Sequence, residues 1–345
     1  MKIAQIAPLY ESVPPSLYGG TERVVAHLTD ALVELGNEVT LFAANGSHTS
    51  GVLVTARDQA LRLDQTPLKS ELASHLRLLS EVQRRADEFD VLHFHVDLLH
   101  FPFFEDIAHK VLTTLHGRLD MKDLDGAYSR WHRYPLVSIS QHQRTPLPNA
   151  NWIDTIYHGL SHTSFRLHQS AGHYLAFLGR ISPEKRPDRA INIARAAGLP
   201  LKIAAKVDAA DREYFEQRIC PLLALPGVEY IGEIGDHEKS DFLGNARALL
   251  FPIDWPEPFG LVMIEAMACG TPVIAWNCGS VPEVVEHGVT GFIINSEQEA
   301  VIATRQVLEL DRQVIRDVFV RRFSAKVMAQ RYVDLYRTLT GGSYS

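Results

Sequence analysis

The chain has 345 residues, of which 46% are hydrophobic and 22% charged, and its net charge is -7 at neutral pH. This length predicts two domains, and the even spread of charge leaves no basic face of the kind that binds nucleic acid. No apolar run approaches the roughly eighteen residues of a membrane-spanning helix. Three cysteines without metal-ligand spacing and a first strand without a leader pattern favour a cytoplasmic protein.

Strands and helices alternate through the first half of the sequence. The pattern predicts a strand at 2–7, a polar loop, a helix at 20–35, a strand at 38–43 and one or two short strands within 52–63. It then predicts a long helix at 68–88, a strand at 91–94, a short helix near 103, and strands at 111–116, 136–139 and 152–157.

The alternation starts again near residue 173. Strands are predicted at 174–178, 201–205, 228–231, 248–251 and 271–275, and helices at 187–197, 209–220, 239–245, 261–269 and 325–339. The fold class is therefore α/β, with two doubly wound parallel sheets. We expect domains at 1–165 and 173–324.

A pair of glutamates frames the most informative stretch, D-W-P-E-P-F-G-L-V-M-I-E (254–265). Glu257 precedes a predicted helix, whereas Glu265 lies inside an apolar part of that helix and needs a polar partner. The helix N-terminus at Phe259, Gly260 and Leu261 is suited to bind an anion. The alternative is an ordinary strand-helix-strand unit with one capping glutamate and one buried, hydrogen-bonded glutamate.

This stretch resembles the E-x7-E signature of retaining glycosyltransferases of family 4, which have the GT-B fold. The similarity continues through A-C-G-T-P-V-I-A, G-S-V-P-E-V-V and G-V-T-G-F (268–292). The resemblance implies two Rossmann-like domains facing a central cleft, with the last helix (within 325–345) packing back on the first domain. It also implies transfer of a hexose from a nucleotide sugar to a hydroxyl group, with retention at the anomeric carbon.

Further residues match the family pattern by position. In L-Y-G-G-T-E-R (17–23), Gly19 and Gly20 would lie against the donor diphosphate, although such a pair is often only a turn. In G-R-I-S-P-E-K, Arg180 and Lys185 would neutralise the departing diphosphate, although two cations in one loop are often only solvated. His116 in T-L-H-G would lie beside the donor sugar, although a lone histidine there is often a hydrogen-bonded spacer.

The resemblance also implies roles for the motif itself. Glu265 would bind the ribose hydroxyls, Glu257 the hydroxyls of the transferred sugar, and the amides of Phe259, Gly260 and Leu261 the diphosphate. Because cations replace a metal in this fold, no metal and no other cofactor is expected. UDP-glucose is the first expectation for the donor and GDP-mannose the alternative; the acceptor would be a saccharide or another small molecule.

Some features leave alternatives open. His158 and Ser161 replace the Asn and Asp of the usual P-N-G-x-D, which precedes the linker near 158–172. The alternatives to hexose transfer are another GT-B activity, such as an epimerase or a phosphorylase, and a non-catalytic sugar-nucleotide sensor. Peripheral membrane contact is a further alternative. His93 and His95 are expected on opposite faces of a strand, and so predict no paired metal site.

Overall fold

The computed structural model describes residues 1–16, 19–170 and 172–341. The chain forms two compact units. Unit 1 comprises Met1–Gly159 and Ala325–Ser345, and unit 2 comprises Leu160–Ser324. The division falls inside the predicted linker region.

Unit 1 contains a seven-stranded sheet in which every neighbouring pair is parallel. The strands follow the order β3-β2-β1-β4-β5-β6-β7. Their bounds are β1 Lys2–Ile6, β2 Glu38–Ala44, β3 Val52–Arg57, β4 Val91–Phe94, β5 Val111–Thr114, β6 Leu136–Ser138 and β7 Trp152–Thr155. The order reverses between β1 and β4, and ligands of doubly wound sheets bind at the carboxyl ends of the strands at such a reversal.

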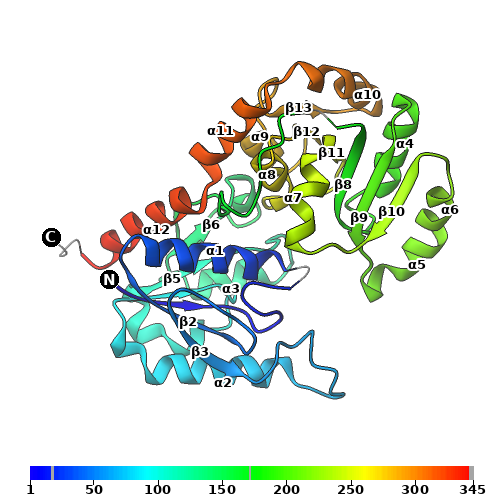
Figure 1. Cartoon of the computed structure of the whole chain (residues 1–345). Coiled ribbons are helices and arrows are strands. Elements are labelled where there is room, and N and C mark those ends of the chain that lie inside the picture. Colours follow the sequence, from blue (N-terminus) through cyan, green and yellow to red (C-terminus); the bar gives the residue numbers. More distant parts are fainter. Residues whose placement is uncertain (17–18, 171, 342–345) are drawn as a thin grey trace. The chain divides into compact units, whose positions relative to one another are not determined.

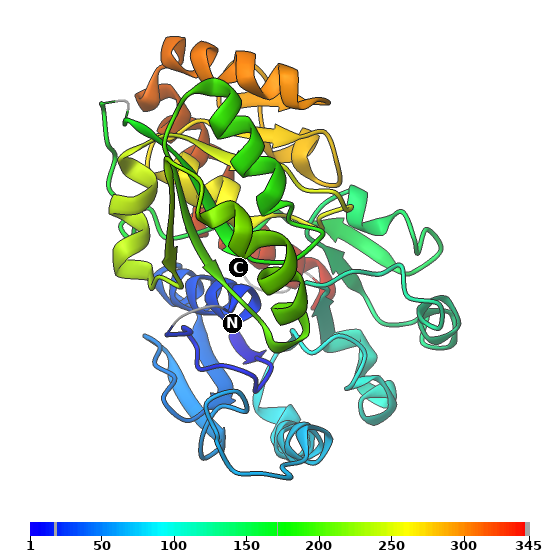
Figure 2. The ribbon, with the colours of Figure 1, turned by 90° about the vertical axis from the view of Figure 1, so that its right-hand side faces the viewer.

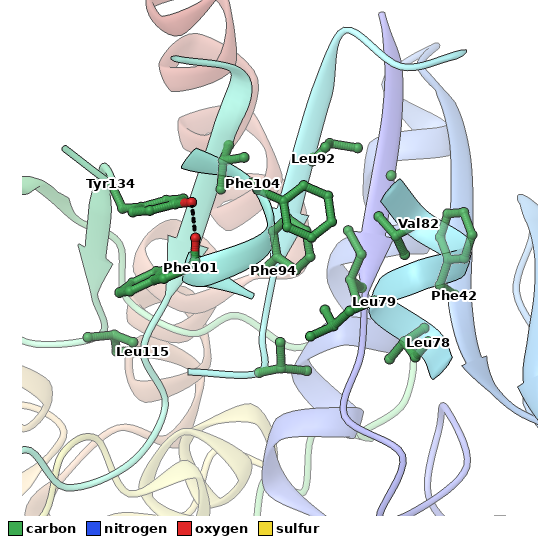
Figure 3. Close-up of a cluster of buried hydrophobic side chains, with 14 of the residues drawn as sticks. Phe42, Leu78, Leu79, Val82, Leu92, Phe94, Phe101, Phe104, Leu115 and Tyr134 are labelled. Carbon is green, nitrogen blue, oxygen red and sulfur yellow. Dashed lines mark hydrogen bonds between the residues drawn. The ribbon is translucent and has the colours of Figure 1, made fainter. Parts of the chain in front are cut away.

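Strand periodicity divides the unit 1 core between the two faces of this sheet. On one face, Phe42 and Phe94 pack with Leu79 of α2 (Glu71–Arg84), as Figure 3 shows. On the other face, Leu41 of β2 packs with Val25 of α1 (Gly20–Glu34). Helix α12 (Ala325–Leu339, red in Figure 1) packs against α1 (blue), so the last helix belongs to unit 1.

The start of α2 differs from the prediction because of a cap. The predicted helix begins at residue 68, but Leu68 has a left-handed φ of 57°, and the Oγ of Ser70 accepts a hydrogen bond from Ala73 N at 3.2 Å. A serine in this role fixes the first turn of a helix. The helix therefore begins at Glu71 and ends at Arg84, followed by a 3-10 turn at Ala86–Glu88.

Unit 2 repeats the architecture with six parallel strands in the order β10-β9-β8-β11-β12-β13. The strands are β8 Tyr174–Arg180, β9 Leu201–Lys206, β10 Val228–Gly232, β11 Ala246–Phe251, β12 Val273–Trp276 and β13 Gly291–Ile294. Its order reverses between β8 and β11. The two sheets confirm the predicted α/β, doubly wound fold class.

Most of the helices in unit 2 connect one strand to the next. These include α4 Pro187–Ala197, α7 Asp236–Gly244, α8 Leu261–Ala268 and α9 Val281–Val284, whereas α10 Glu297–Gln306 and α11 Arg312–Phe323 follow β13. Helix α4 packs against α10, which is orange in Figure 2. The predicted helix at 209–220 is instead a series of short helical pieces, namely a 3-10 turn, α5 (Arg212–Tyr214), a π-helical turn (Phe215–Ile219) and α6 (Cys220–Leu223).

Four elements were not predicted: helix α3 (Leu124–Arg130) of unit 1, and β13, α10 and α11 of unit 2.

In α11, the guanidinium of Arg312 donates to the carbonyl oxygens of His168 (3.0 Å) and Ser170 (2.8 Å) and to Thr271 Oγ1 (3.0 Å). It also donates to the carbonyls of Gly244 and Ala246, at 2.7 and 2.5 Å. One buried arginine therefore joins the start of unit 2 to its interior.

Candidate active site

Two loops meet at the carboxyl ends of β8 and β11, where the strand order of unit 2 reverses. The first loop follows Arg180, the last residue of β8, and the second follows Phe251, the last residue of β11. Asp254 N donates to Glu184 O at 2.8 Å and joins the two loops. The topology thus brings the predicted residues Arg180, Lys185 and Glu257 to one edge of the sheet.

Lys185 and Glu257 form a direct ion pair across these loops. Lys185 Nζ donates to Glu257 Oε2, and Trp255 Nε1 donates to the same oxygen at 2.7 Å. The Nζ atom also lies 5.1 Å from the centre of the Trp255 ring, within cation–π range. The two charged side chains are 15% and 12% exposed, so the carboxylate and the ammonium are held in fixed positions and still reach the surface.

Arg180 is surrounded by carboxylates of its own unit. Its Nη2 lies 2.5 Å from Glu184 Oε1, its Nη1 lies 3.5 Å from Asp208 Oδ2, and its Nε lies 3.7 Å from Asp211 Oδ2. These acids hold the guanidinium at the end of β8. They also offset its positive charge, so an anionic ligand has to compete with them.

Helix α8 begins directly after the Glu257 loop. Gly260 precedes it with a left-handed φ of 81°, and a Cβ there would lie 2.8 Å from Met263 Cε and 3.0 Å from Phe251 Cζ. As a glycine, Gly260 supplies no side-chain cap to this helix. The positive end of the helix dipole lies at this turn, and the binding of a diphosphate by the amides of Phe259, Gly260 and Leu261 stays a prediction.

The turn before α9 holds the Glu257 loop from the other side. Ser280 N donates to Glu257 O at 3.0 Å, and Ser280 Oγ donates to Phe259 O at 2.7 Å. A Cβ on Gly279 (φ 59°) would lie 2.4 Å from Glu257 N and 2.5 Å from Glu257 O. Only a glycine allows this approach, so Gly279 positions Glu257, a role that sequence analysis did not assign to it.

The polar partner that Glu265 requires is Lys239 of α7. Lys239 Nζ donates to Glu265 Oε1 at 2.8 Å and lies 3.3 Å from Asp236 Oδ1. The side chains of Lys239 and Glu265 are 9% and 2% exposed. Because the two residues are 26 positions apart, no local pattern links them, and sequence analysis did not find Lys239. Binding of ribose by Glu265 stays a prediction.

The predicted residues of unit 1 lie at the ends of its own strands and helices. Gly19 and Gly20 are at the start of α1, where Arg23 N donates to Gly19 O at 3.1 Å. A Cβ on Gly19 would lie 2.7 Å from Pro15 Cβ, so the backbone approaches this proline closely. Leu17 and Tyr18 of the same motif lie outside the described residues.

His116 follows β5 and contacts two other histidines. Its Nε2 lies 2.8 Å from His95 Nδ1, and its ring stacks on His158 with the ring centres 5.1 Å apart. Burial lowers the pKa of His116 to about 3, so the imidazole is neutral near pH 7. Among the described residues its Nδ1 is buried and has no hydrogen-bond partner.

The expectation that His93 and His95 face opposite ways was wrong. Their ring centres are 4.1 Å apart, because residues two positions apart on a strand share one face. Both lie on the same face as Gln5, the strand neighbour of His93 in the register of β1 with β4. The described part of the chain contains no group of three or more His, Cys, Asp or Glu able to hold a metal ion.

Family models match both units of the chain. Residues 18–153 match the model for Glycosyltransferase Family 4, and residues 165–316 match the model for Glycosyl transferases group 1. The chain belongs to glycosyltransferase family 4. The predicted family is thereby confirmed, and the protein is a glycosyltransferase of the GT-B type.

Relatives and solved structures agree with this membership. The phosphatidyl-myo-inositol mannosyltransferase of Mycobacterium leprae is 23% identical over 381 residues, covering 99% of this chain and 98% of that protein. The structure of AviGT4, a glycosyltransferase involved in avilamycin A biosynthesis, is 25% identical with a TM-score of 0.75, covering 99% of this chain and 98% of that one. HepE of Anabaena in complex with UDP and glucose is 21% identical with a TM-score of 0.73, covering 98% of this chain and all of that one (100%).

No helix in the described ranges is both long and apolar enough to cross a bilayer.

Proposed function

We propose that this family 4 member transfers a hexose from a nucleotide sugar, with UDP-glucose as first choice, to a hydroxyl of a saccharide or another small molecule. The observation that carries the proposal is the arrangement at the ends of β8 and β11. There a cation, a carboxylate and a helix N-terminus without a capping side chain on its N-cap residue lie together, at Lys185, Glu257 and Gly260. A nucleoside diphosphate sugar presents phosphates and hydroxyls together, which suits this combination.

The departing diphosphate gains negative charge as the glycosidic bond breaks. Lys185 and Arg180 would meet this charge, together with the dipole of α8 and the backbone at Gly20, so that no metal ion is needed. Lys185 is already desolvated against Trp255, which strengthens its attraction to an anion. As phosphate replaces Glu257 at Lys185, the carboxylate of Glu257 becomes available to the hydroxyls of the sugar.

The proposed stereochemical outcome is retention. A retaining enzyme that forms a covalent intermediate needs a carboxylate as nucleophile. Here the two motif carboxylates each bond a lysine, Glu257 with Lys185 and Glu265 with Lys239. Glu257, once phosphate replaces it at Lys185, is proposed to bind hydroxyls of the sugar, and Glu265 is proposed to bind ribose. Neither is then left as a nucleophile, and we therefore favour attack from the same face as the departing diphosphate, with His116 close to the sugar.

The donor is proposed from two kinds of support. HepE, which shares the fold, has been observed with UDP and glucose, whereas the full-length relative from M. leprae is named a mannosyltransferase. UDP-glucose and GDP-mannose are accordingly the two donors to compare. Uridine with glucose remains the first choice.

The test is an assay for free nucleoside diphosphate with UDP-glucose, GDP-mannose and other nucleotide sugars, with and without a panel of saccharide acceptors. We expect acceptor-dependent release, and NMR of the product should show that the anomeric configuration of the donor is kept. Release without an acceptor and with epimerised sugar would favour an epimerase. Tight binding of nucleotide sugars without any release would favour a sensor.

A further inference from the structure

A chain of hydrogen bonds crosses the interior of unit 1 and ends at His116. It starts at Tyr336 of α12, whose hydroxyl lies 2.7 Å from His93 Nδ1 and accepts from Gln5 Nε2 at 3.1 Å. It continues through Gln5 Oε1, which lies 2.7 Å from His95 Nε2, and through His95 Nδ1, which lies 2.8 Å from His116 Nε2. Every residue of this chain other than His116 is at most 4% exposed.

The proton positions along this chain follow from charge and valence. Burial, more than the neighbouring histidine charges, lowers the pKa values of His93 and His95 well below their ordinary value. Both rings, like that of His116, are therefore neutral, and each carries one N–H. A neutral imidazole that donates at one nitrogen must accept at the other.

The Gln5 amide fixes the direction of the chain. Its Nε2 atom donates to the Tyr336 oxygen at 3.1 Å and also lies 3.3 Å from His93 Nδ1. The hydroxyl hydrogen of Tyr336 is directed to the single lone pair of His93 Nδ1 at 2.7 Å, and His93 Nε2–H donates to Thr114 Oγ1 at 2.8 Å. In this arrangement Gln5 Oε1 is an acceptor.

The consequence reaches His116 in two steps. Because Gln5 Oε1 accepts, His95 carries its proton on Nε2 and accepts at Nδ1. His116 must then donate from Nε2, which leaves its Nδ1 unprotonated. His116 Nδ1 is the buried nitrogen that has no hydrogen-bond partner among the described residues. It is therefore an acceptor that a ligand donor could satisfy.

We propose that Gln5 and His95 are positioning residues that hold His116 in the Nε2–H tautomer, so that His116 Nδ1 accepts a hydrogen bond from a hydroxyl of the transferred sugar. The hydrogen bond from a sugar hydroxyl to His116 Nδ1 rests on the proposed function. The assignment of the Nε2–H tautomer does not rest on it. The orientation of the Gln5 amide depends on α12, because the hydroxyl of Tyr336 accepts a hydrogen bond from Gln5 Nε2.

The first experiment measures the tautomer without substrate. NMR of the full-length protein labelled with 15N-histidine distinguishes Nε2–H from Nδ1–H, and the spectrum of His116→Gln identifies the His116 signals. We expect a single Nε2–H tautomer in the wild type. Gln5→Glu should keep it, because a carboxylate still accepts from His95, whereas Gln5→Leu should give a mixture. His100→Asn is the matched control, because His100 is equally buried and bonds Thr113 instead of this chain.

The second experiment measures specificity with a series of donors that each lack one hydroxyl of the sugar. The wild type should lose about tenfold in kcat/KM with one of them, the value of one hydrogen bond, and Gln5→Leu should lose most of this discrimination. Gln5→Glu should restore it. A wild-type His116 in the Nδ1–H form or in a mixture would overturn the proposal, as would full discrimination in Gln5→Leu.

The two experiments also separate this inference from the proposed function. A protein with the Nε2–H tautomer that turns over no nucleotide sugar would contradict the proposed function and confirm the positioning of His116. A working glycosyltransferase whose His116 has mixed tautomers would contradict the positioning alone.

Discussion

Lys239 and Glu265 form an ion pair inside unit 2, with Nζ 2.8 Å from Oε1 and both side chains almost fully buried. Deleting one member of a buried pair leaves the other charge uncompensated, at a cost of about 3 to 5 kcal/mol. The stability of unit 2 and the proposed binding of ribose therefore depend on the same carboxylate.

We expect Glu265→Gln to separate these two effects. The amide oxygen still accepts from Lys239, so the variant should unfold at a temperature closer to the wild type than Glu265→Ala does. Its affinity for UDP should fall, because a hydrogen bond to a charged group contributes about 1.5 to 3 kcal/mol. Thermal denaturation and calorimetric titration with UDP measure the two quantities.

Glu257→Gln is the matched control for UDP binding. Glu257 is proposed to bind the sugar, which UDP lacks, and its carboxylate competes with phosphate for Lys185, so this variant should bind UDP at least as well as the wild type and turn over more slowly. An equal loss of UDP affinity in Glu257→Gln and Glu265→Gln would show that the roles of the two glutamates have been assigned wrongly.

Gly279→Ala should reduce turnover by moving Glu257. The new Cβ would meet the Glu257 backbone at 2.4 and 2.5 Å, so the loop carrying this carboxylate has to shift. A misplacement of about 1 Å costs on the order of a hundredfold in rate. We expect kcat at saturating donor to fall much more than the affinity for UDP.

Gly288→Ala provides the control for backbone strain. Gly288 also has a left-handed φ, of 78°, but a Cβ there would meet nothing within 4 Å. Gly288→Ala should lower the free energy of unfolding by about 1 kcal/mol and leave kcat unchanged. Similar kcat values for the two variants would mean that Gly279 does not position Glu257.

The fold was predictable because its local signals are strong. Helix α4 has the predicted bounds, with Pro187 in its first turn and Gly198 in a left-handed conformation at its end. The caps of α10 and α11 were present as signals too, since Ser296 and Asp311 accept hydrogen bonds from the first turns, but the sequence analysis did not use them.

The candidate site was predictable only where its residues belong to a contiguous motif. Lys239 reaches Glu265 from another helix, and Gly279 reaches Glu257 from another loop, so tertiary packing alone brings them together. Gln5 carried a signal of a different kind. A polar side chain within the buried strand I-A-Q-I-A needs a partner, a requirement that the sequence analysis did not use, and the structure supplies that partner in His95.

Unit 1 should be more sensitive to acid than unit 2. Burial lowers the pKa values of five histidines of unit 1: His93, His95, His100, His116 and His158. Below their unfolded pKa of about 6.5 the unfolded chain binds protons that the folded unit does not. The stability that these histidines contribute to unit 1 is thus fully present above about pH 6.5. It is lost as the pH falls, by up to about 1.4 kcal/mol per pH unit for each histidine.

Two carboxyls of unit 1 oppose this trend. Desolvation raises the pKa values of Glu22 and Asp97, so that each favours the folded state as the pH falls through its folded pKa. The five histidines outnumber them. Urea unfolding of protein labelled with fluorotryptophan can resolve the units, because Trp131 and Trp152 report on unit 1, and Trp255 and Trp276 on unit 2. From pH 7 to pH 5.5 the unit 1 midpoint should fall further, and equal shifts would contradict the prediction.

Turnover should persist in excess chelator and depend instead on Arg180 and Lys185. Both cations lie at the end of β8, Lys185 bonded to Glu257 and Arg180 held by Glu184. If they meet the charge of the departing diphosphate, removing either should cost about a hundredfold to a thousandfold in kcat. We would assay Arg180→Ala and Lys185→Ala at saturating donor.

The control for charge and folding is Lys202→Ala. Lys202 pairs with Glu229 at 3.1 Å near the amino end of β9, whereas the proposed site lies at the carboxyl ends of the strands. Lys202→Ala should leave kcat within about twofold of the wild type, since exposed ion pairs contribute little to stability. Loss of turnover in chelator that Mg²⁺ or Mn²⁺ restores would contradict the metal-free mechanism. Near-normal turnover in both Arg180→Ala and Lys185→Ala would contradict the proposed role of these residues, because the loss of either one is expected to slow turnover.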